Sequence, residues 1–291
     1  MPVANVRGVA LNYEVLGARG PWVALSPGGR RPLEGVKPLA QRVAGAGYRV
    51  LIHDRRNCGA SDVTIGGKDP ENEIWADDLH ELLGQMKALP AVVGGGSSGC
   101  RLALLLALRY PHAVSGLLLW RVTGGRFAAR RLAEQYYGQF IKAAETGGMA
   151  AVCATEHWRE RIEARPSNRD TLMSMDPQRF IAALSEWRKY FIQSGDQPVL
   201  GASEADLRSI KVPACVIPGN DRTHAIQTGR TLARLLPHAE LHELYDHDED
   251  VDVVPPEEWQ KKDGEIAAIF TGFLKRIETP ASAARACVVS R

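Results

Sequence analysis

Short apolar runs alternate with amphipathic stretches along the first 120 residues. The apolar runs are almost continuous, as is typical of strands buried on both faces, and they cover residues 22–26, 48–54, 91–93 and 114–120. The stretches between them repeat apolar side chains at helical spacing, over residues 39–44, 74–86 and 101–109. A hairpin is predicted before them, over residues 6–15. The sequence therefore predicts an α/β fold with a mostly parallel, doubly wound sheet.

The pattern changes after residue 125. Residues 126–205 contain helical patterns and no convincing buried strand, and the alternation resumes at 212–217. A helix over 226–236, a strand over 239–244 and a last amphipathic helix over 257–277 follow. We therefore expect an α/β core of residues 1–125 and 206–278, a helical cap of residues 126–205, and a flexible C-terminal tail of residues 279–291.

Composition narrows the classes of partner. Hydrophobic residues make up 45% of the chain and charged residues 24%, and the formal net charge is +2. This balance gives no electrostatic reason to expect nucleic acid or an anionic membrane, so we expect a small-molecule substrate and a monomer or homodimer. The five cysteines are scattered, no secretory signal pattern is visible at the N-terminus, and the longest apolar run, 102–108, is too short to cross a bilayer. A soluble, cytoplasmic protein is predicted.

The strongest chemical motif is Gly-Gly-Ser-Ser-Gly at residues 95–99, which matches G-x-S-x-G between a predicted strand and a predicted helix. Glycines there allow the strand and helix to approach closely, so that a strained turn presents the Ser97 hydroxyl and the Ser98 amide can bind an oxyanion. Ser98 fits worse as the nucleophile because its second small position would fall on Cys100. The alternative is a glycine-rich turn that binds phosphate or only bends, although it lacks the P-loop lysine.

These features resemble an α/β hydrolase with a helical cap, over about residues 6–277. Pro27-Gly28-Gly29 occupies the place of the family's oxyanion loop, so the resemblance implies Gly29, or alternatively Gly28, as the second oxyanion amide. Residues 54–61 resemble the D-x-R-G-x-G-x-S turn, with Asn57 replacing the first glycine. That turn is usually scaffold, which makes a structural role more expected for Arg56 than a catalytic one.

The family order of nucleophile, acid and histidine implies Asp221 as the acid, because it follows a strand through a Pro-Gly turn. Capping of the next helix is its alternative role. The order implies His247 as the base, although neighbouring carboxylates should favour its imidazolium form. His242 and His224 are possible substitutes in poorer positions, and an incomplete triad is the alternative. The acidic loop lacks EF-hand spacing, and no metal or organic cofactor is expected.

The remaining candidates concern the substrate. Arg30, Arg31 or Arg121 could bind a substrate carboxylate, although such arginines are more often solvated or structural. Trp120, Trp158 and Trp187 suit an apolar acyl or aryl pocket, and cap packing is their alternative role. The expected activity is hydrolysis of a small carboxylic ester through an acyl-enzyme. The alternatives are hydrolysis of a carbon–carbon bond in a β-diketone or ring-cleavage product, and a non-catalytic, ligand-binding protein with a hydrolase-like scaffold.

Overall fold

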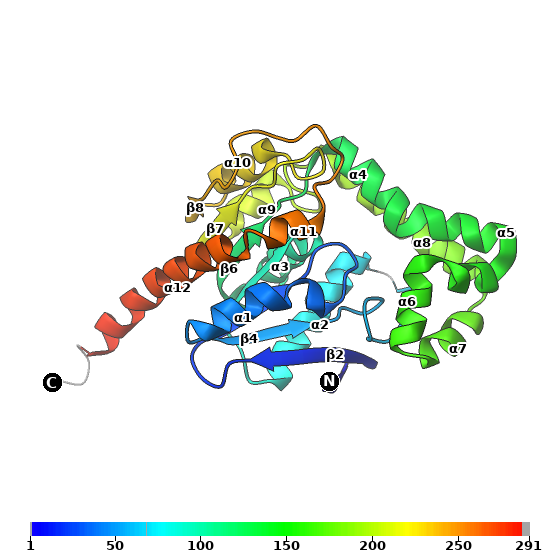
Figure 1. Cartoon of the computed structure of the whole chain (residues 1–291), viewed down its shortest axis with the longest axis horizontal. Coiled ribbons are helices and arrows are strands. Elements are labelled where there is room, and N and C mark those ends of the chain that lie inside the picture. Colours follow the sequence, from blue (N-terminus) through cyan, green and yellow to red (C-terminus); the bar gives the residue numbers. More distant parts are fainter. Residues whose placement is uncertain (1, 68, 287–291) are drawn as a thin grey trace.

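The protein is built on one eight-stranded sheet with the strand order β1-β2-β4-β3-β5-β6-β7-β8 (Figure 1). The computed structural model describes residues 2–67 and 69–286. β1 and β2 form an antiparallel hairpin, β2 also pairs antiparallel with β4, and the other neighbouring strands pair in parallel. The strands are β1 (Val3–Val6), β2 (Val9–Leu16), β3 (Trp22–Ser26), β4 (Arg49–His53), β5 (Ala91–Gly96), β6 (Val114–Trp120), β7 (Ala214–Ile217) and β8 (Ala239–Leu241). The predicted fold class, a mostly parallel doubly wound sheet, is confirmed.

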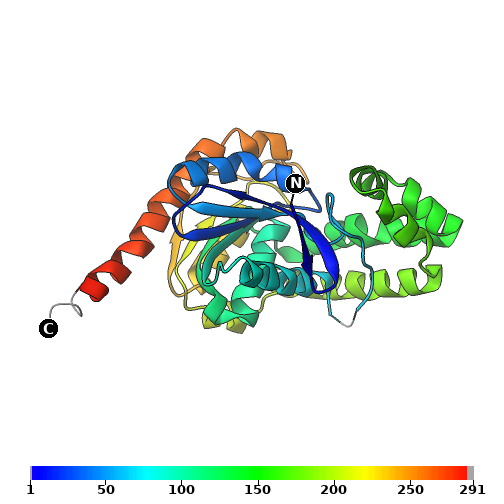
Figure 2. The same cartoon turned by 90° about the horizontal axis from the view of Figure 1, so that it is seen from below.

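Helices cover both faces of the sheet, because the apolar side chains of the parallel strands point to both sides (Figure 2). One face packs against α1 and the C-terminal helices, with Leu39 and Phe270 in the same apolar cluster. The other face packs against α2, α3 and α10, with Leu79, Leu102 and Leu232 in a second cluster. These helices are α1 (Lys37–Gly45), α2 (Glu71–Gln85), α3 (Ser98–Arg109), α9 (Glu204–Ser209), α10 (Ile226–Leu235), α11 (Pro256–Gln260) and α12 (Asp263–Ala286).

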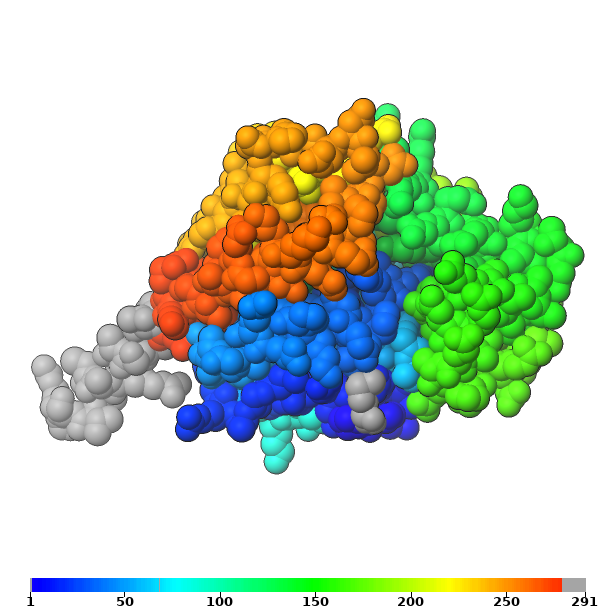
Figure 3. Space-filling model, viewed as in Figure 1, coloured from blue at the N-terminus to red at the C-terminus, as the bar shows by residue number. Residues whose placement is uncertain are grey.

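The chain leaves the sheet after β6 and forms a set of helices before it returns at β7. These helices share a third apolar cluster, which includes Tyr137, Trp158 and Phe191. In the space-filling view they form a green lobe beside the blue and orange core (Figure 3). The elements are α4 (Gly125–Ala133), a π-helical turn (Glu134–Gly138), α5 (Gln139–Ala154), α6 (Glu156–Ala164), α7 (Ser167–Met173), α8 (Pro177–Gln193) and a 3-10 turn (Ser194–Asp196). The boundaries of the cap at 126 and 205 stay a prediction.

Two further features bear on the predicted boundaries. The last predicted helix is divided into α11 and α12, and α12 continues to Ala286, beyond the expected start of the tail at 279. Residues 287–291 of that tail lie outside the described residues.

None of the helices in residues 2–67 and 69–286 combines the length and the apolar character that spanning a bilayer requires.

The parallel register brings the carboxyl ends of β3, β5, β6 and β7 to one edge of the sheet. Ser26 pairs with Gly95, Gly96 with Trp120, and Trp120 with Ile217. The segments that follow these strands therefore meet at the same edge, which is where open α/β sheets bind their ligands. The candidate functional residues lie in those segments.

Candidate active site

Ser97 occupies the sharp turn between β5 and α3. Its backbone is in an unusual conformation for a residue with a side chain, with φ 54° and ψ −112°. Its N–H donates to the carbonyl of Trp120 at 3.0 Å, which holds the turn against the end of β6. A conformation of this kind costs on the order of 1–3 kcal/mol and is typical of functional sites.

The two outer glycines of the motif are required by close backbone approaches. A Cβ atom on Gly95 would lie 2.3 Å from the carbonyl carbon of Gly99, so the strand and the helix touch there. A Cβ atom on Gly99 would lie 2.3 Å from the carbonyl oxygen of Ser26, at the end of β3. A side chain at either position would push the turn out of place. The glycine pattern in the sequence thus has a direct steric cause.

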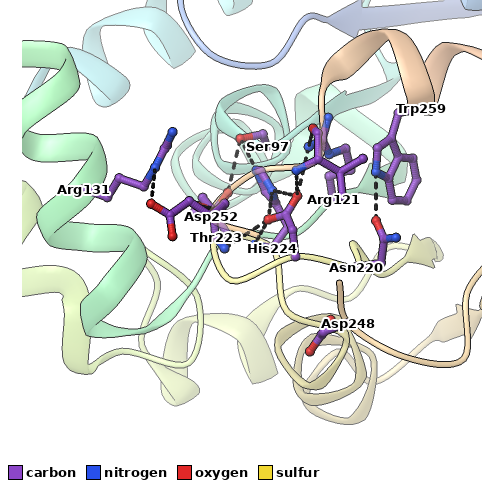
Figure 4. A network of polar contacts seen from close by, with 12 residues as sticks. Ser97, Arg121, Arg131, Asn220, Thr223, His224, Asp248, Asp252 and Trp259 are labelled. Atoms are coloured by element: carbon purple, nitrogen blue, oxygen red, sulfur yellow. Dashed lines mark hydrogen bonds and ion pairs between the residues drawn. The ribbon is translucent and has the colours of Figure 1, made fainter. Parts of the chain in front are cut away.

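An imidazole contacts the Ser97 hydroxyl, and it belongs to His224. His224 Nε2 lies 2.9 Å from Ser97 Oγ, and His224 Nδ1 lies 2.8 Å from Asp221 Oδ1 (Figure 4). The serine, histidine and carboxylate therefore form one continuous hydrogen-bonded chain. Asp221 and His224 both come from the loop between β7 and α10, only three residues apart.

Backbone N–H groups fix the Asp221 carboxylate. Oδ1 accepts from the N–H groups of Thr223 at 3.0 Å and His224 at 2.9 Å, and Oδ2 accepts from Val254 N–H at 3.0 Å. The tight turn from Asp221 to His224 brings the imidazole back onto the carboxylate that organises the turn. Capping of α10, the alternative role for Asp221, is performed by Asp248, whose Oδ1 accepts from the N–H of Ile226 at 2.9 Å.

The environment sets the charge of both groups. Burial raises the pKa of Asp221, but the hydrogen bond from His224, the Val254 N–H and the charge of Arg121 outweigh it and lower the pKa to about 2. Burial lowers the pKa of His224, and this outweighs the opposing hydrogen bond to Asp221. At neutral pH the acid is therefore ionised and the imidazole neutral, which is the state that a general base needs.

His247 does not reach Ser97, and its expected place beside the serine is wrong. Its side chain is 72% exposed, and its Nδ1 lies 2.6 Å from Asp246 Oδ1. The loop after β8 presents its backbone to the site, because Arg222 N–H and Thr223 N–H donate to the carbonyls of Val251 and Asp252, each at 3.1 Å. These bonds hold the loop across the 221–224 turn and leave His247 at the surface. His242, the other substitute considered, lies 3.4 Å from Glu240 Oε2 through Nε2.

Two residues directly after β6 also contact the hydrogen-bonded residues Ser97 and Asp221. Thr123 Oγ1 lies 3.3 Å from Ser97 Oγ, a contact that no motif in the sequence indicates. Arg121, considered either as a substrate clamp or as a structural residue, lines the cavity and donates through Nη2 to Asp221 Oδ2 at 3.1 Å and to the Val254 carbonyl at 2.9 Å. The Arg121 side chain is buried and its charge is paired, so it braces the acid and the loop after β8.

The predicted oxyanion residues lie in the two segments that border Ser97. Ser98 is the first residue of α3, where backbone N–H groups have no partner within the helix. A Cβ atom on Gly28 would lie 3.3 Å from Ser97 Cβ, so the loop after β3 packs directly against the serine. Gly29 follows with φ 56°, and its carbonyl accepts from the Ser98 hydroxyl at 2.7 Å. The roles of the Gly29 and Ser98 amides stay predictions.

A cavity of about 840 Å³ opens at Ser97 and His224. Its walls come from the segment after β3, from α1, from the end of β6, from the loops after β7 and β8, from the helices after β6 and from α11 and α12. Trp120 lines it, as expected for a pocket residue. Trp158 and Trp187 are absent from its described lining: both are buried among the helices after β6, where Trp187 donates to the Asp69 carbonyl at 3.1 Å.

Arg30 lines the same cavity, but its guanidinium is already paired. It forms a buried ion pair with Glu71, which also accepts from Asn57 at 2.9 Å and from the Tyr137 hydroxyl at 3.1 Å. The rings of Tyr136 and Tyr137 lie 5.5 Å and 5.3 Å from its charged carbon. Sequence reasoning did not single out Glu71, which begins a helix far from the motifs.

Cation ligands are not grouped around this site. Within the part of the chain that the structure describes, no three His, Cys, Asp or Glu side chains come together in a way that could hold a metal ion. The carboxylate of the site, Asp221, is instead surrounded by N–H donors and a guanidinium. The arrangement can move a proton from a hydroxyl to an imidazole and stabilise the resulting positive charge.

Comparison with known proteins shows the family and agrees with the fold. Residues 27–249 match the family model of the alpha/beta hydrolase fold. The chain is 33% identical over 110 residues to an uncharacterized hydrolase of Bacillus subtilis, a match that covers 38% of this chain and 40% of that protein, so less than half of that relative is spanned. It is 26% identical over 198 residues to 2-hydroxymuconate semialdehyde hydrolase of Pseudomonas putida, covering 67% of this chain and 68% of that one. The enol-lactonase structure from Burkholderia xenovorans LB400 superposes with a TM-score of 0.62 at 23% identity, over 94% of this chain and 100% of the other.

Proposed function

The chain belongs to the alpha/beta hydrolase fold family, and we propose that it is a serine hydrolase that cleaves small carboxylic esters. The observation that carries the proposal is the hydrogen-bonded chain from Ser97 through His224 to Asp221, with contacts of 2.9 Å and 2.8 Å. In this proposal Ser97 is the nucleophile, His224 the general base and Asp221 the acid that orients it. His224 therefore takes the role first expected for His247.

The first half of the reaction forms an acyl-enzyme. Neutral His224 accepts the Ser97 proton on Nε2 as Ser97 Oγ attacks the ester carbonyl. The amides of Gly29 and Ser98 stabilise the oxyanion, and such a donor typically lowers the barrier by about 3 kcal/mol. Asp221 stabilises the imidazolium that forms, since its carboxylate accepts from Nδ1. The imidazolium then gives its proton to the leaving alcohol.

The second half releases the acid. A water molecule takes the place of the alcohol and loses a proton to His224 Nε2 as it attacks the acyl carbonyl. The same two amides bind the second oxyanion. Collapse of this intermediate returns the proton to Ser97 Oγ, and the carboxylic acid leaves. No other group is required to complete the cycle.

The cavity supports a substrate with an apolar portion. The lining includes apolar side chains from the residue before α1 and from α1, β6, α11 and α12, namely Val36, Leu39, Trp120, Trp259 and Ile266. Three guanidiniums were first considered as carboxylate clamps, and all three line the cavity and are paired. Arg30 pairs with the buried Glu71, Arg121 with the buried Asp221, and Arg31 with the exposed Glu257. We therefore favour an uncharged ester over a substrate that must be held by its carboxylate.

Carbon–carbon bond hydrolysis is the second candidate function. It is supported by the match to 2-hydroxymuconate semialdehyde hydrolase over 67% of this chain. The buried ion pairs of Arg30 and Arg121 count against it, since a ring-cleavage product presents a carboxylate that needs a free cation. Arg31, which pairs with the exposed Glu257, is the weakest part of that objection. The third alternative was a non-catalytic, ligand-binding protein with a hydrolase-like scaffold. It loses its main support because an imidazole does contact Ser97.

The test replaces the serine. Ser97→Ala should reduce turnover of p-nitrophenyl acetate to the rate seen without enzyme, and it should abolish labelling by a fluorophosphonate probe. Ser209→Ala, on the exposed surface of α9, is the matched control and should keep both. Ester turnover that persists in Ser97→Ala would reject the proposal. Wild-type turnover of a dienoate without turnover of any ester would favour the second candidate.

A further inference from the structure

The structure assigns to Arg55 a part in the reaction that rests on the proposed function: it is a positioning residue for the oxyanion hole. Arg55 follows β4, in the 54–61 turn, and its guanidinium reaches both predicted oxyanion residues. It touches neither Ser97 nor His224 in any hydrogen bond among the described residues. Its effect on the reaction would therefore pass through Gly29 and Ser98.

The contacts form a closed triangle. Arg55 Nη2 donates to the Gly29 carbonyl at 2.7 Å, and Nη1 donates to Ser98 Oγ at 2.9 Å. Ser98 Oγ in turn donates to the Gly29 carbonyl at 2.7 Å. Two donors on one carbonyl restrain the peptide that joins Gly29 to Arg30, and the same bonds tie the loop after β3 to the first turn of α3. Arg55 therefore holds residue Gly29, and with it the N–H on the other side of its Cα atom, in place relative to Ser98.

The charge of Arg55 is unusual for a buried scaffold residue. The residue is only 1% exposed, and no carboxylate within the described residues forms an ion pair with it. The ring of Trp75, 4.4 Å from its charged carbon, is the surface on which the guanidinium rests. A buried cation without an acid partner is unfavourable for folding, and such departures are typical of functional sites.

The neighbouring arginine provides the contrast. Arg56, in the same turn, is also buried, but it pairs with Asp78 through two hydrogen bonds of 2.6 Å. The Asp78 carboxylate neutralises the charge of Arg56, and structural support is a sufficient role for this ion pair. Arg55 instead places a positive charge without a carboxylate partner beside the Gly29 carbonyl and the Ser98 hydroxyl, in the two residues whose amides are proposed to bind a developing negative charge. Preorganised charge of this kind stabilises the transition state more than the bound ester.

The experiment compares substitutions at the two arginines. Arg55→Met should lower kcat on p-nitrophenyl acetate by roughly 10- to 100-fold with KM changed less than about threefold, because the lost interaction acts on the oxyanion. Arg55→Lys, which keeps the charge, should recover part of the loss. Ser98→Ala keeps the Arg55–Gly29 bond and should lose less than Arg55→Met. Rates are expressed per active site, titrated with the fluorophosphonate.

Arg56→Met is the matched control. It should lower the melting temperature, because Asp78 loses its buried partner, and leave kcat per titrated site within about twofold. The inference is overturned if Arg55→Met keeps wild-type kcat, if Arg56→Met loses as much, or if Arg55→Lys is no better than Arg55→Met. If the wild-type protein has no Ser97-dependent ester turnover, the proposed function fails first and the inference falls with it.

Discussion

Two loops at the edge of the sheet each carry a histidine beside an aspartate, but the fold buries one of these pairs and leaves the other exposed. In the loop after β7, Asp221 and His224 are buried and joined by a contact of 2.8 Å. In the loop after β8, Asp246 and His247 are joined by a contact of 2.6 Å, but their side chains are 95% and 72% exposed. The local pairing is similar, and only the surroundings differ.

The surroundings decide the charge of each imidazole. Burial lowers the pKa of His224 despite its carboxylate partner. At His247 the hydrogen bond to Asp246 and the nearby acidic charges raise the pKa, because desolvation there is slight. One imidazole is therefore neutral near pH 7, and the other keeps its proton to a higher pH than an unperturbed histidine. A histidine next to a carboxylate can act as a base only where the fold also removes water and directs Nε2 at the hydroxyl group whose proton it would accept.

The two loops also depend on each other. The backbone of the second loop provides the carbonyls of Val251 and Asp252 and the N–H of Val254, all bound to the first loop. Its Asp248 caps α10 directly after His224. The loop after β8 thus holds Asp221 and His224 in position through its backbone. Three predictions compare substitutions in the two loops, from the largest expected effect to the smallest.

The largest difference is expected from removing each imidazole. His224→Ala should lower kcat/KM for p-nitrophenyl acetate by at least about 10⁴-fold, because Ser97 loses its proton acceptor. His247→Ala should stay within about twofold of the wild type, because its contacts are at the surface. Steady-state kinetics on both variants measure the contrast. If His247→Ala is the more damaging change, the assignment of the base is wrong.

The two carboxylates should differ somewhat less. Asp221→Asn should lower kcat by roughly 10³- to 10⁴-fold, because the amide cannot stabilise the imidazolium and favours the wrong tautomer. It should also lower the melting temperature, since Oδ2 accepts from Val254 N–H and Arg121. Asp246→Asn is the control and should change neither quantity appreciably. A kcat loss in Asp246→Asn similar to that in Asp221→Asn would show that the acidic loop acts on the reaction.

The smallest and sharpest difference is in pH dependence. The proposed mechanism requires neutral His224, whose pKa lies below 6.5, so kcat/KM should rise with pH through a midpoint below 6.5 and be level at neutral pH. His247, with its pKa raised above 6.5, should titrate at higher pH in an NMR experiment. His247→Ala should remove that resonance and leave the kinetic midpoint in place. A kinetic midpoint above 6.5 that disappears in His247→Ala would contradict this account.

The sequence by itself determined the elements and the serine turn. Apolar runs and helical periodicity depend on neighbouring residues, so the parallel strands and the covering helices could be predicted closely. The turn at Ser97 is equally local, because Gly95 and Gly99 lie within two residues of it and their missing side chains carry the information. The insertion after β6 showed itself in the same way, as a change of period.

Only the tertiary structure decided which side chains meet. Arg121 and Asp221 are separated by 100 residues, and Ser97 and His224 by 127, so no local pattern reports either contact. The same holds for Arg30, whose partner Glu71 lies 41 residues away and occupies the charge expected to bind a substrate. The physical reason is that burial and pairing of charges depend on the whole packed fold, whereas strands, helices and tight turns depend on their own few residues.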